Sequence, residues 1–101
     1  MRGGKWTMWE GGTHLTGFIH APSHLPAKAQ NFTGLMHQCD WVPTLVGAAG
    51  VSLTAEELSV PRNDFEDHDI PPMDGINMWP TFTSGNTTDP GPRNSVLLNV
   101  C

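Results

Sequence analysis

One lysine near the start of the sequence is placed where it could bind an anion. Residues 2–12 spell "RGGKWTMWEGG", so Lys5 lies between Gly4 and Trp6. An ammonium on a flexible stem can approach a sulfate or phosphate while backbone N–H groups of a glycine-rich loop add fixed donors. Trp6 and Trp9 would line an apolar or sugar-binding wall beside it. The alternative is an exposed lysine with two packing tryptophans, and the stretch alone leaves both open.

Metal-binding and nucleophilic residues form no complete site in this sequence. His20 and His24 are four residues apart, but Pro22 between them prevents the shared helical face of a zinc-binding pair. The acidic stretch "DFEDHD" lacks the glycine and the closing glutamate of a calcium-binding hand. Cys39 stands among apolar neighbours, which favours packing, and no serine or cysteine has a local base beside it. We therefore predict no metal site and no nucleophile here.

Composition and charge exclude two classes of partner. The 101 residues include 5 basic and 10 acidic side chains, and the net charge of -5 argues against nucleic acid and anionic membranes. No stretch is apolar for long enough to span a membrane, and the first residues do not resemble a signal peptide. Two glycosylation sequons, at Asn31 and Asn86, nevertheless fit a product of the secretory pathway. Two cysteines, Cys39 and Cys101, leave the redox state open.

The segments around these residues are predicted to be loops and two short strands. Residues 1–12 should form a loop, because their four glycines interrupt both helical and strand periodicity. The apolar runs of residues 15–22, "LTGFIHAP", and 95–101, "SVLLNVC", have the length and composition of strands. Two short strands do not make a stable sheet, so we expect both to belong to a larger one. The chain therefore looks incomplete.

The clearest predicted helix covers residues 40–50. Asp40 is a good N-cap, Pro43 falls in the first turn, and Gly50 stands where a left-handed residue would end the helix. Apolar residues at helical spacing predict one stripe that faces a core: Val42, Leu45, Val46 and Ala49.

Two shorter elements are expected further along the chain. A second helix should begin at Thr54, whose capping box closes with Glu57, and end before Pro61. The stretch "MDGINMWP" predicts a turn at residues 74–75 and one helical turn before Pro80. Because strands and helices alternate, the predicted fold class is α/β.

Five stretches in collinear order resemble the type I sulfatases, closest to the arylsulfatase B-like branch. The most specific parts are Lys-Trp followed by Glu-Gly-Gly, the start His-x-x-Asp-Trp-x-Pro-Thr-Leu, and Asp-Gly followed by tryptophan. The resemblance covers nearly the whole chain, through these stretches: "RGGKWTMWEGG", "GFIHAP", "MHQCDWVPTLVGAAG", "MDGINMWPTFTSG" and "SVLL". It implies that residues 1–101 are the C-terminal portion of a sulfatase catalytic domain, with an alkaline-phosphatase-like mixed sheet flanked by helices.

The resemblance also implies a chemistry of which this sequence carries one part. In the family, a formylglycine made from the cysteine of a Cys-x-Pro-x-Arg motif attacks sulfur beside a calcium ion held by acidic residues. Neither Cys39 nor Cys101 stands in that motif, and the matching calcium ligands would lie before Met1. Lys5 matches the lysine that contacts the substrate sulfate. Where the family usually shows a small apolar residue and an arginine, this chain has Thr13 and His14.

Two hypotheses follow. The first is a fragment of a lysosomal or secreted sulfatase, which acts on an aryl sulfate or sulfated glycan together with the remainder of its domain. Alone, such a fragment should be inactive and poorly stable. The second is a non-catalytic secreted glycoprotein that binds sulfated sugars through Lys5, Trp6 and Trp9. The identity of the substrate, the oligomeric state and the ability of the chain to fold alone stay open.

Overall fold

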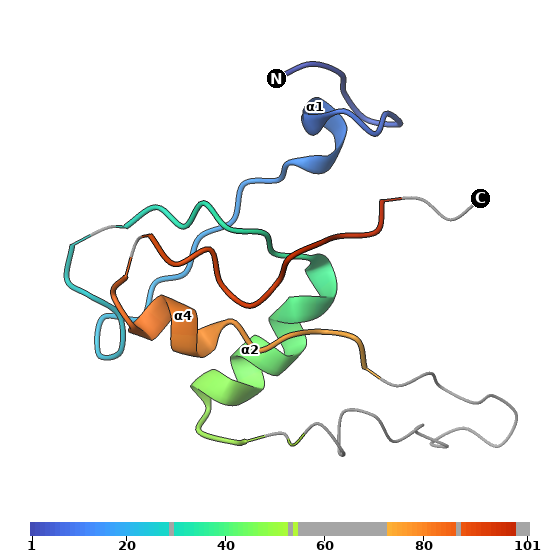
Figure 1. The fold of residues 1–101 in the computed structure, drawn as a ribbon. Coiled ribbons are helices and arrows are strands. Elements are labelled where there is room, and N and C mark those ends of the chain that lie inside the picture. Colours follow the sequence, from blue (N-terminus) through green and yellow to red (C-terminus); the bar gives the residue numbers. More distant parts are fainter. Residues whose placement is uncertain (29, 53, 55–72, 87, 99–101) are drawn as a thin grey trace, which may run out of the picture.

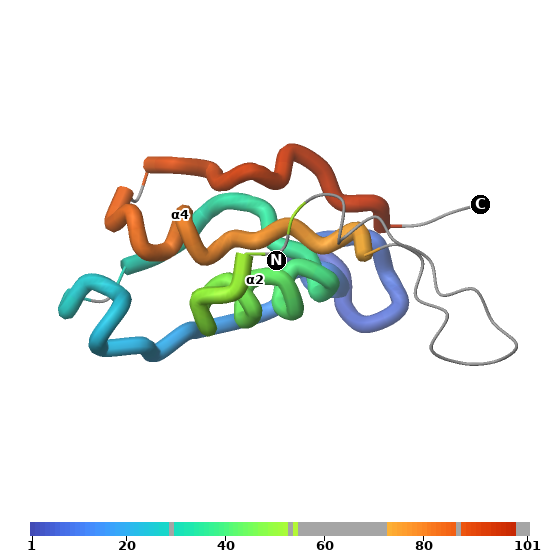
Figure 2. Tube along the Cα trace, turned by 90° about the horizontal axis from the view of Figure 1, so that it is seen from below, coloured from blue at the N-terminus to red at the C-terminus, as the bar shows by residue number. Residues whose placement is uncertain are grey.

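The computed structural model describes five ranges of the chain, and its regular elements there are short helices. The ranges are residues 1–28, 30–52, 54, 73–86 and 88–98. The helices, labelled in Figure 1, are α1 (Glu10–Thr13), η1 (Gln38–Asp40), α2 (Trp41–Ala48) and α4 (Trp79–Thr83). Extended chain and turns connect them. In the view from below, helix α2, helix α4 and residues 88–96 are arranged in that order from the bottom to the top of the picture (Figure 2).

The predicted helix of residues 40–50 is confirmed, and its C-terminus ends as expected. Gly50 has a φ of +80°, and the N–H groups of Gly50 and Val51 donate to the carbonyls of Gly47 at 3.0 Å and Val46 at 3.2 Å. This pair of bonds is the Schellman arrangement, which satisfies the last carbonyls of a helix. Pro43 lies in the first turn of α2, where its missing N–H breaks no helical bond.

The N-terminus of this helix differs from the prediction in its detail. Asp40 precedes α2 but does not cap it with its side chain. Its carboxylate instead accepts the N–H of His37 at 2.7 Å and closes the capping box of η1, one turn earlier. The 3-10 turn therefore carries the capping interaction, and α2 continues directly from it.

The predicted apolar stripe of α2 is wrong. Val42, Leu45 and Ala49 are exposed, and Val46 is half-buried. The buried residues of α2 are Pro43 and Thr44, a position that apolar periodicity alone does not select. The buried face of α2 therefore carries the Thr44 hydroxyl, whereas Val42 and Leu45 are exposed.

Helix α4 packs against α2 through Thr44. The Thr44 hydroxyl accepts the N–H of Met78 at 3.0 Å and lies 3.5 Å from the carbonyl oxygen of Ile76. Met78 is fully buried. The helical turn expected before Pro80 actually begins at Trp79 and includes Pro80 in its first turn, where proline needs no N–H partner. Nearby, Phe32 and Phe82 meet edge to face, with ring centroids 5.3 Å apart.

The other predictions of secondary structure have different outcomes. The predicted loop of residues 1–12 ends in the single turn α1. Within the described ranges, residues 15–22 and 95–98 form no strand, because no neighbouring strand pairs with them there. The predicted α/β sheet stays a prediction. The helix expected from Thr54 to Pro61 lies outside the described residues, except for Thr54 itself.

Candidate functional site

The loop that carries Lys5 is closed by backbone hydrogen bonds at two levels. At its tip, the Thr7 N–H donates to the Gly4 carbonyl at 3.1 Å, and the Thr7 hydroxyl donates to the same carbonyl at 2.7 Å. At its base, the Gly11 N–H donates to the Arg2 carbonyl at 2.9 Å. Gly11 approaches the Gly3 backbone so closely that a Cβ there would overlap it. The glycines of the motif thus allow a tight, closed loop.

Lys5 and Trp6 occupy the two central positions of the turn at the tip. Trp6 has a φ of +78°, a left-handed conformation that a bulky residue seldom adopts. Trp6 is 93% exposed. Backbone strain of this kind is typical of sites where the chain must hold a side chain in a defined place. Lys5 and Trp6 are both exposed at this turn.

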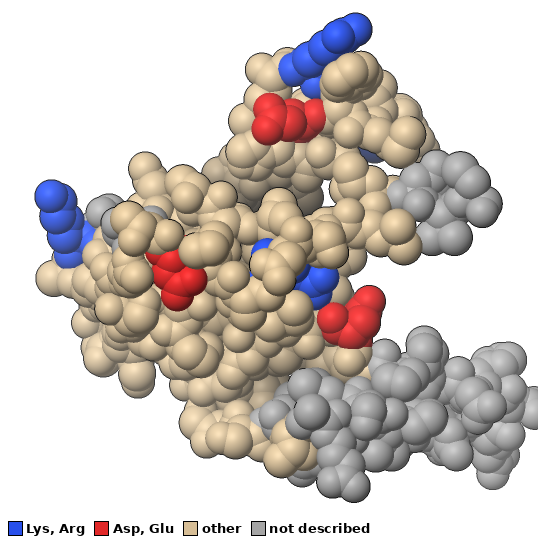
Figure 3. Space-filling model, in the orientation of Figure 1, with Lys and Arg blue, Asp and Glu red and all other residues tan. Residues whose placement is uncertain are grey.

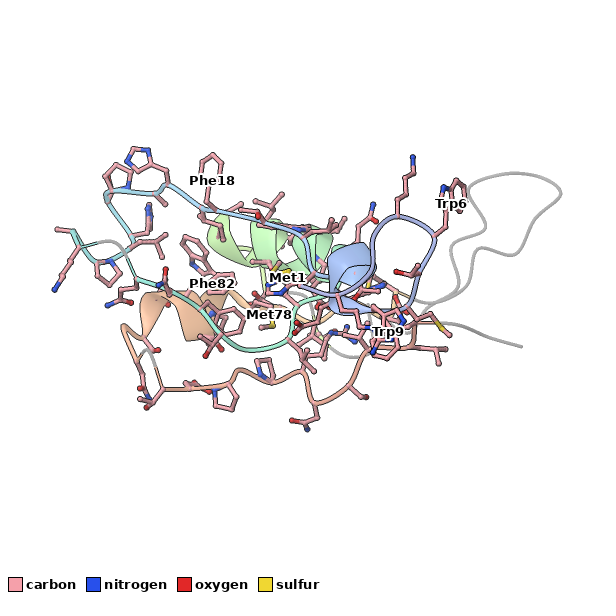
Figure 4. The ribbon with its side chains drawn as sticks, turned by 90° about the horizontal axis from the view of Figure 1, so that it is seen from above. Met1, Trp6, Trp9, Phe18, Met78 and Phe82 are labelled. Carbon is pink, nitrogen blue, oxygen red and sulfur yellow. The ribbon has the colours of Figure 1, made fainter. Side chains whose placement is uncertain are left out.

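The structure brings Lys5 to Trp6 and places Trp9 elsewhere. The Lys5 Nζ lies 5.5 Å from the centroid of the Trp6 ring, within range of a cation–π interaction. Trp9 pairs instead with Arg2, whose Cζ lies 4.2 Å from the centroid of the Trp9 ring. Figure 4 shows Trp6 and Trp9 on opposite sides of the loop. The two tryptophans therefore form two separate cation–aromatic pairs.

Basic side chains of this loop project into solvent. Figure 3 shows them at one end of the molecule, apart from the basic group near its centre. Within the described residues, the structure records one ion pair, between Arg93 and Asp40. Among the same residues, neither Lys5 nor Arg2 forms an ion pair. Both residues are exposed.

A second polar cluster lies at the start of α2, around a fully buried carboxylate. Asp40 accepts hydrogen bonds from the Arg93 Nε at 2.7 Å, the Arg93 terminal nitrogen at 2.5 Å and the Ile76 N–H at 2.8 Å. Burial by itself raises the pKa of Asp40, but hydrogen bonds from Arg93, His37 and Ile76 outweigh it and lower that pKa. The hydrogen bond to Asp40 raises the pKa of Arg93. Asp40 and Arg93 therefore form a charged pair at neutral pH.

Cys39 borders this ion pair but is not activated by it. Its Sγ lies 2.9 Å from the His37 Nδ1 and 3.7 Å from a terminal nitrogen of Arg93. Burial, followed by the charges of Asp40 and Asp74, raises the pKa of the thiol above 9.0. A protonated thiol is a weak nucleophile. The sequence predicted no base beside a cysteine, but the structure places the His37 ring there; the packing role of Cys39 stays a prediction.

The remaining predicted residues lie apart from the Lys5 loop. Asn31 and Asn86, the two sequon asparagines, are both exposed. The Asn86 Oδ1 accepts the Thr88 hydroxyl at 2.8 Å. His24 packs against Trp79, with ring centroids 5.9 Å apart, which is a structural contact.

Two kinds of feature are absent from the described part of the chain. There, no three acidic, histidine or cysteine side chains come together to hold a metal ion. Among the same residues, no helix has the length and apolar character needed to cross a membrane.

Comparison with known proteins finds a curated sulfatase. The chain is 34% identical over 100 residues to arylsulfatase J of Mus musculus, an alignment that covers 99% of this chain. The chain spans only 14% of the length of that relative. No protein-family model and no solved structure matches the chain. The similarity supports the predicted sulfatase fragment, whereas the arylsulfatase B-like branch stays a prediction.

Two arginines were missed by the sequence analysis. Arg2 lies within the "RGGKW" stretch, but nothing in the spacing shows that it stacks on Trp9. Arg93 lies in a segment without helix or strand and has no periodic signal, and its carboxylate partner is 53 residues away. A contact over such a separation becomes visible only when the chain is folded.

Proposed function

We propose that this chain is the C-terminal portion of a sulfatase catalytic domain, in which Lys5 contacts the substrate sulfate. The observation that carries this proposal is the 34% identity to arylsulfatase J along 99% of the chain. The loop geometry supports it, because a closed, glycine-rich turn places the Lys5 ammonium at an exposed tip, where it forms no ion pair with the other described residues. The parent enzyme would hydrolyse sulfate esters, either aryl sulfates or sulfated glycans, in a lysosomal or secreted setting.

The role of Lys5 in such an enzyme is electrostatic. Negative charge builds on the oxygen atoms of a sulfate ester as the S–O bond to the leaving group breaks. An ammonium that is already oriented toward these oxygens stabilises the transition state more than the ground state. One well-placed donor of this type contributes about 3 kcal/mol. The turn from Gly4 to Thr7 fixes the backbone from which the lysine extends, so that little order is lost on binding.

The residues of this chain do not fit the cofactors that the family resemblance implies. A formylglycine would supply the nucleophile and calcium would bind the sulfate, but Cys39 and Cys101 lie outside the required motif. The pKa of Cys39 is raised, and the described residues gather no metal-binding group. We therefore propose that both cofactors belong to other parts of the parent enzyme.

The proposal predicts a sharp contrast between the isolated chain and a complete domain. The isolated chain, given 4-nitrophenyl sulfate and calcium, should release no product above buffer. The complete domain is a chimera: mouse arylsulfatase J in which this chain replaces the 100 residues that it matches. This chimera should hydrolyse the same ester. Turnover by the isolated chain, or a folded chimera without activity, would contradict the proposal.

A second function, binding of sulfated sugars without catalysis, is favoured by one observation. The loop presents two exposed cation–aromatic pairs, Lys5 with Trp6 and Arg2 with Trp9. Aromatic faces stack on sugar rings while cations bind sulfate groups. This function predicts retention of the isolated chain on immobilised sulfated glycan that weakens as salt rises. Lys5→Ala should reduce retention, and Lys28→Ala, which removes an exposed lysine elsewhere, should not.

A further inference from the structure

The hydroxyl of Thr7 holds both backbone polar groups of Gly4, the residue that precedes Lys5. The Thr7 Oγ1 accepts the Gly4 N–H at 3.1 Å and donates to the Gly4 carbonyl at 2.7 Å. The N–H belongs to the peptide before Gly4, and the carbonyl belongs to the peptide that joins Gly4 to Lys5. Because each peptide unit is planar, one hydroxyl fixes the orientation of both units.

Steric packing does not restrain Gly4 in the same way. A Cβ at Gly4 would meet nothing within 4 Å. A residue without a Cβ reaches more backbone conformations than any other residue. The direction in which the chain leaves Gly4 toward Lys5 therefore depends on the hydrogen bonds to Thr7.

The turn that carries Lys5 also contains a strained residue. Trp6 is the third residue of this turn, and its φ is +78°. Turns with a positive φ at their third position usually carry glycine there, because a side chain makes the conformation costly. Figure 4 shows Trp6 at the outer edge of the loop. The hydrogen bonds of Thr7, which closes the turn, help to offset the cost of this conformation.

Close contacts with two glycines hold Thr7 itself in place. A Cβ at Gly3 would overlap the Thr7 Oγ1, and a Cβ at Gly12 would overlap the Thr7 carbonyl oxygen. Neither position accepts a side chain while Thr7 keeps this place. Gly12 belongs to α1, so Thr7 is in contact with the helical turn at the end of the loop.

We propose that Thr7 is a positioning residue for the proposed hydrolysis, whose hydroxyl orients Lys5 toward the sulfate group. This inference rests on the proposed function, because the sulfate contact of Lys5 gives that orientation its consequence. An oriented ammonium acts mainly in the transition state, where negative charge builds on the sulfate oxygens. Removal of the Thr7 hydroxyl should therefore lower kcat more than it raises KM.

Three substitutions in the arylsulfatase J chimera defined above isolate the effect of the hydroxyl. Thr7→Val keeps the branched shape, and kcat on 4-nitrophenyl sulfate should fall about 10-fold, part of the effect of about 100-fold that one oriented donor has. KM should change by less than about twofold. Thr7→Ser keeps the hydroxyl and should retain kcat within about twofold. Thr13→Val removes a hydroxyl that donates to the Trp9 carbonyl at 3.4 Å, and this matched control should leave kcat unchanged.

A double-mutant cycle shows whether Thr7 acts through Lys5. In the Lys5→Ala chimera there is no ammonium to position, so Thr7→Val should change kcat by less than about twofold there. An equal loss in the two backgrounds would overturn the proposal. So would an unchanged kcat in Thr7→Val alone, or a loss that Thr7→Ser shares in full. A Thr7→Val chimera that does not fold would also overturn it, because the proposed role of the hydroxyl is local.

The same variants distinguish failure of this inference from failure of the proposed function. Unchanged kcat/KM in Lys5→Ala would refute the proposed role of Lys5 and this inference with it. A large loss in Lys5→Ala beside an unchanged Thr7→Val would refute the positioning role of Thr7 and leave the proposed function intact.

Discussion

The carboxylate of Asp40 and the guanidinium of Arg93 form a two-pronged ion pair, although the residues are 53 positions apart. The two hydrogen bonds measure 2.7 and 2.5 Å, and Asp40 is fully buried. Arg93 also donates to the Asp74 carbonyl at 3.2 Å. This one contact therefore joins the start of α2, residues 74–76 and the C-terminal segment. It has the geometry of the strongest charged hydrogen bonds in proteins.

Removal of Arg93 should destabilise the fold strongly. Arg93→Ala leaves the buried Asp40 charge without its partner, and we expect a loss of about 3 kcal/mol in the free energy of unfolding. Urea unfolding of the arylsulfatase J chimera measures this loss. Arg2→Ala, which removes an exposed arginine, is the matched control and should change the free energy little. Equal effects of the two substitutions would show that the Asp40–Arg93 pair contributes nothing.

The free energy of unfolding should depend on pH through the protonation of Asp40. Its pKa is lowered in the folded chain from an ordinary value of 3.8, so the unfolded chain binds the proton more readily. The resulting stability is present above pH ~4 and is lost as the pH falls through the folded-state pKa. The free energy of unfolding should be measured between about pH 5 and pH 2. As the pH falls, it should decrease less steeply in the Asp40→Asn chimera than in the unsubstituted chimera. A parallel decline in both proteins would be inconsistent with this assignment.

Position 50 should require glycine because of its left-handed backbone conformation and not because of limited space for a side chain. Its φ is +80°, yet a Cβ there would meet nothing within 4 Å. Gly50→Ala should therefore destabilise the chimera by about 1 kcal/mol through conformational strain. Gly4 offers a matched control, because a Cβ there also meets nothing and its φ is not in the left-handed range. If Gly4→Ala and Gly50→Ala destabilise the protein equally in urea unfolding, the explanation is wrong.

Cys39 should react slowly with alkylating reagents near neutral pH. Burial and nearby acidic charges raise its pKa above 9.0, so little thiolate forms. In a Cys101→Ser background, the rate of iodoacetamide labelling of the isolated chain should rise with a midpoint above pH 9.0. Free glutathione provides the reference thiol. Rapid labelling at pH 7 would instead indicate an activated cysteine and would reopen a catalytic role.

The sequence predicted the parts of this structure that depend on local chemistry. Gly50 signalled the end of α2, and Asp40 marked its start, because both preferences arise within one helical turn. The function of the Asp40 side chain was not predictable in the same way, since Arg93 and Ile76 reach it from distant segments. The apolar stripe of α2 failed for a related reason: periodicity shows which residues share a face but not which face the fold buries.

The candidate site was predictable in its residues but not in its arrangement. Lys5 and Trp6 were selected by their glycine-rich setting, and the structure places them together at the tip of a turn. Trp9 was expected beside them, but the loop directs it to the other side, where it stacks with Arg2. Side-chain direction in a closed loop depends on its hydrogen bonds, such as that from Gly11 to Arg2, which sequence spacing does not specify.

We propose that Lys5 stabilises the sulfate group of the substrate during hydrolysis. The most direct measurement is kcat/KM of the arylsulfatase J chimera on 4-nitrophenyl sulfate, with Lys5→Ala compared with Lys28→Ala. We predict a loss of about 100-fold or more for Lys5→Ala, since one oriented donor has an effect of that size. Lys28→Ala should leave kcat/KM unchanged. A folded Lys5→Ala chimera with the activity of the unsubstituted chimera would contradict the claim.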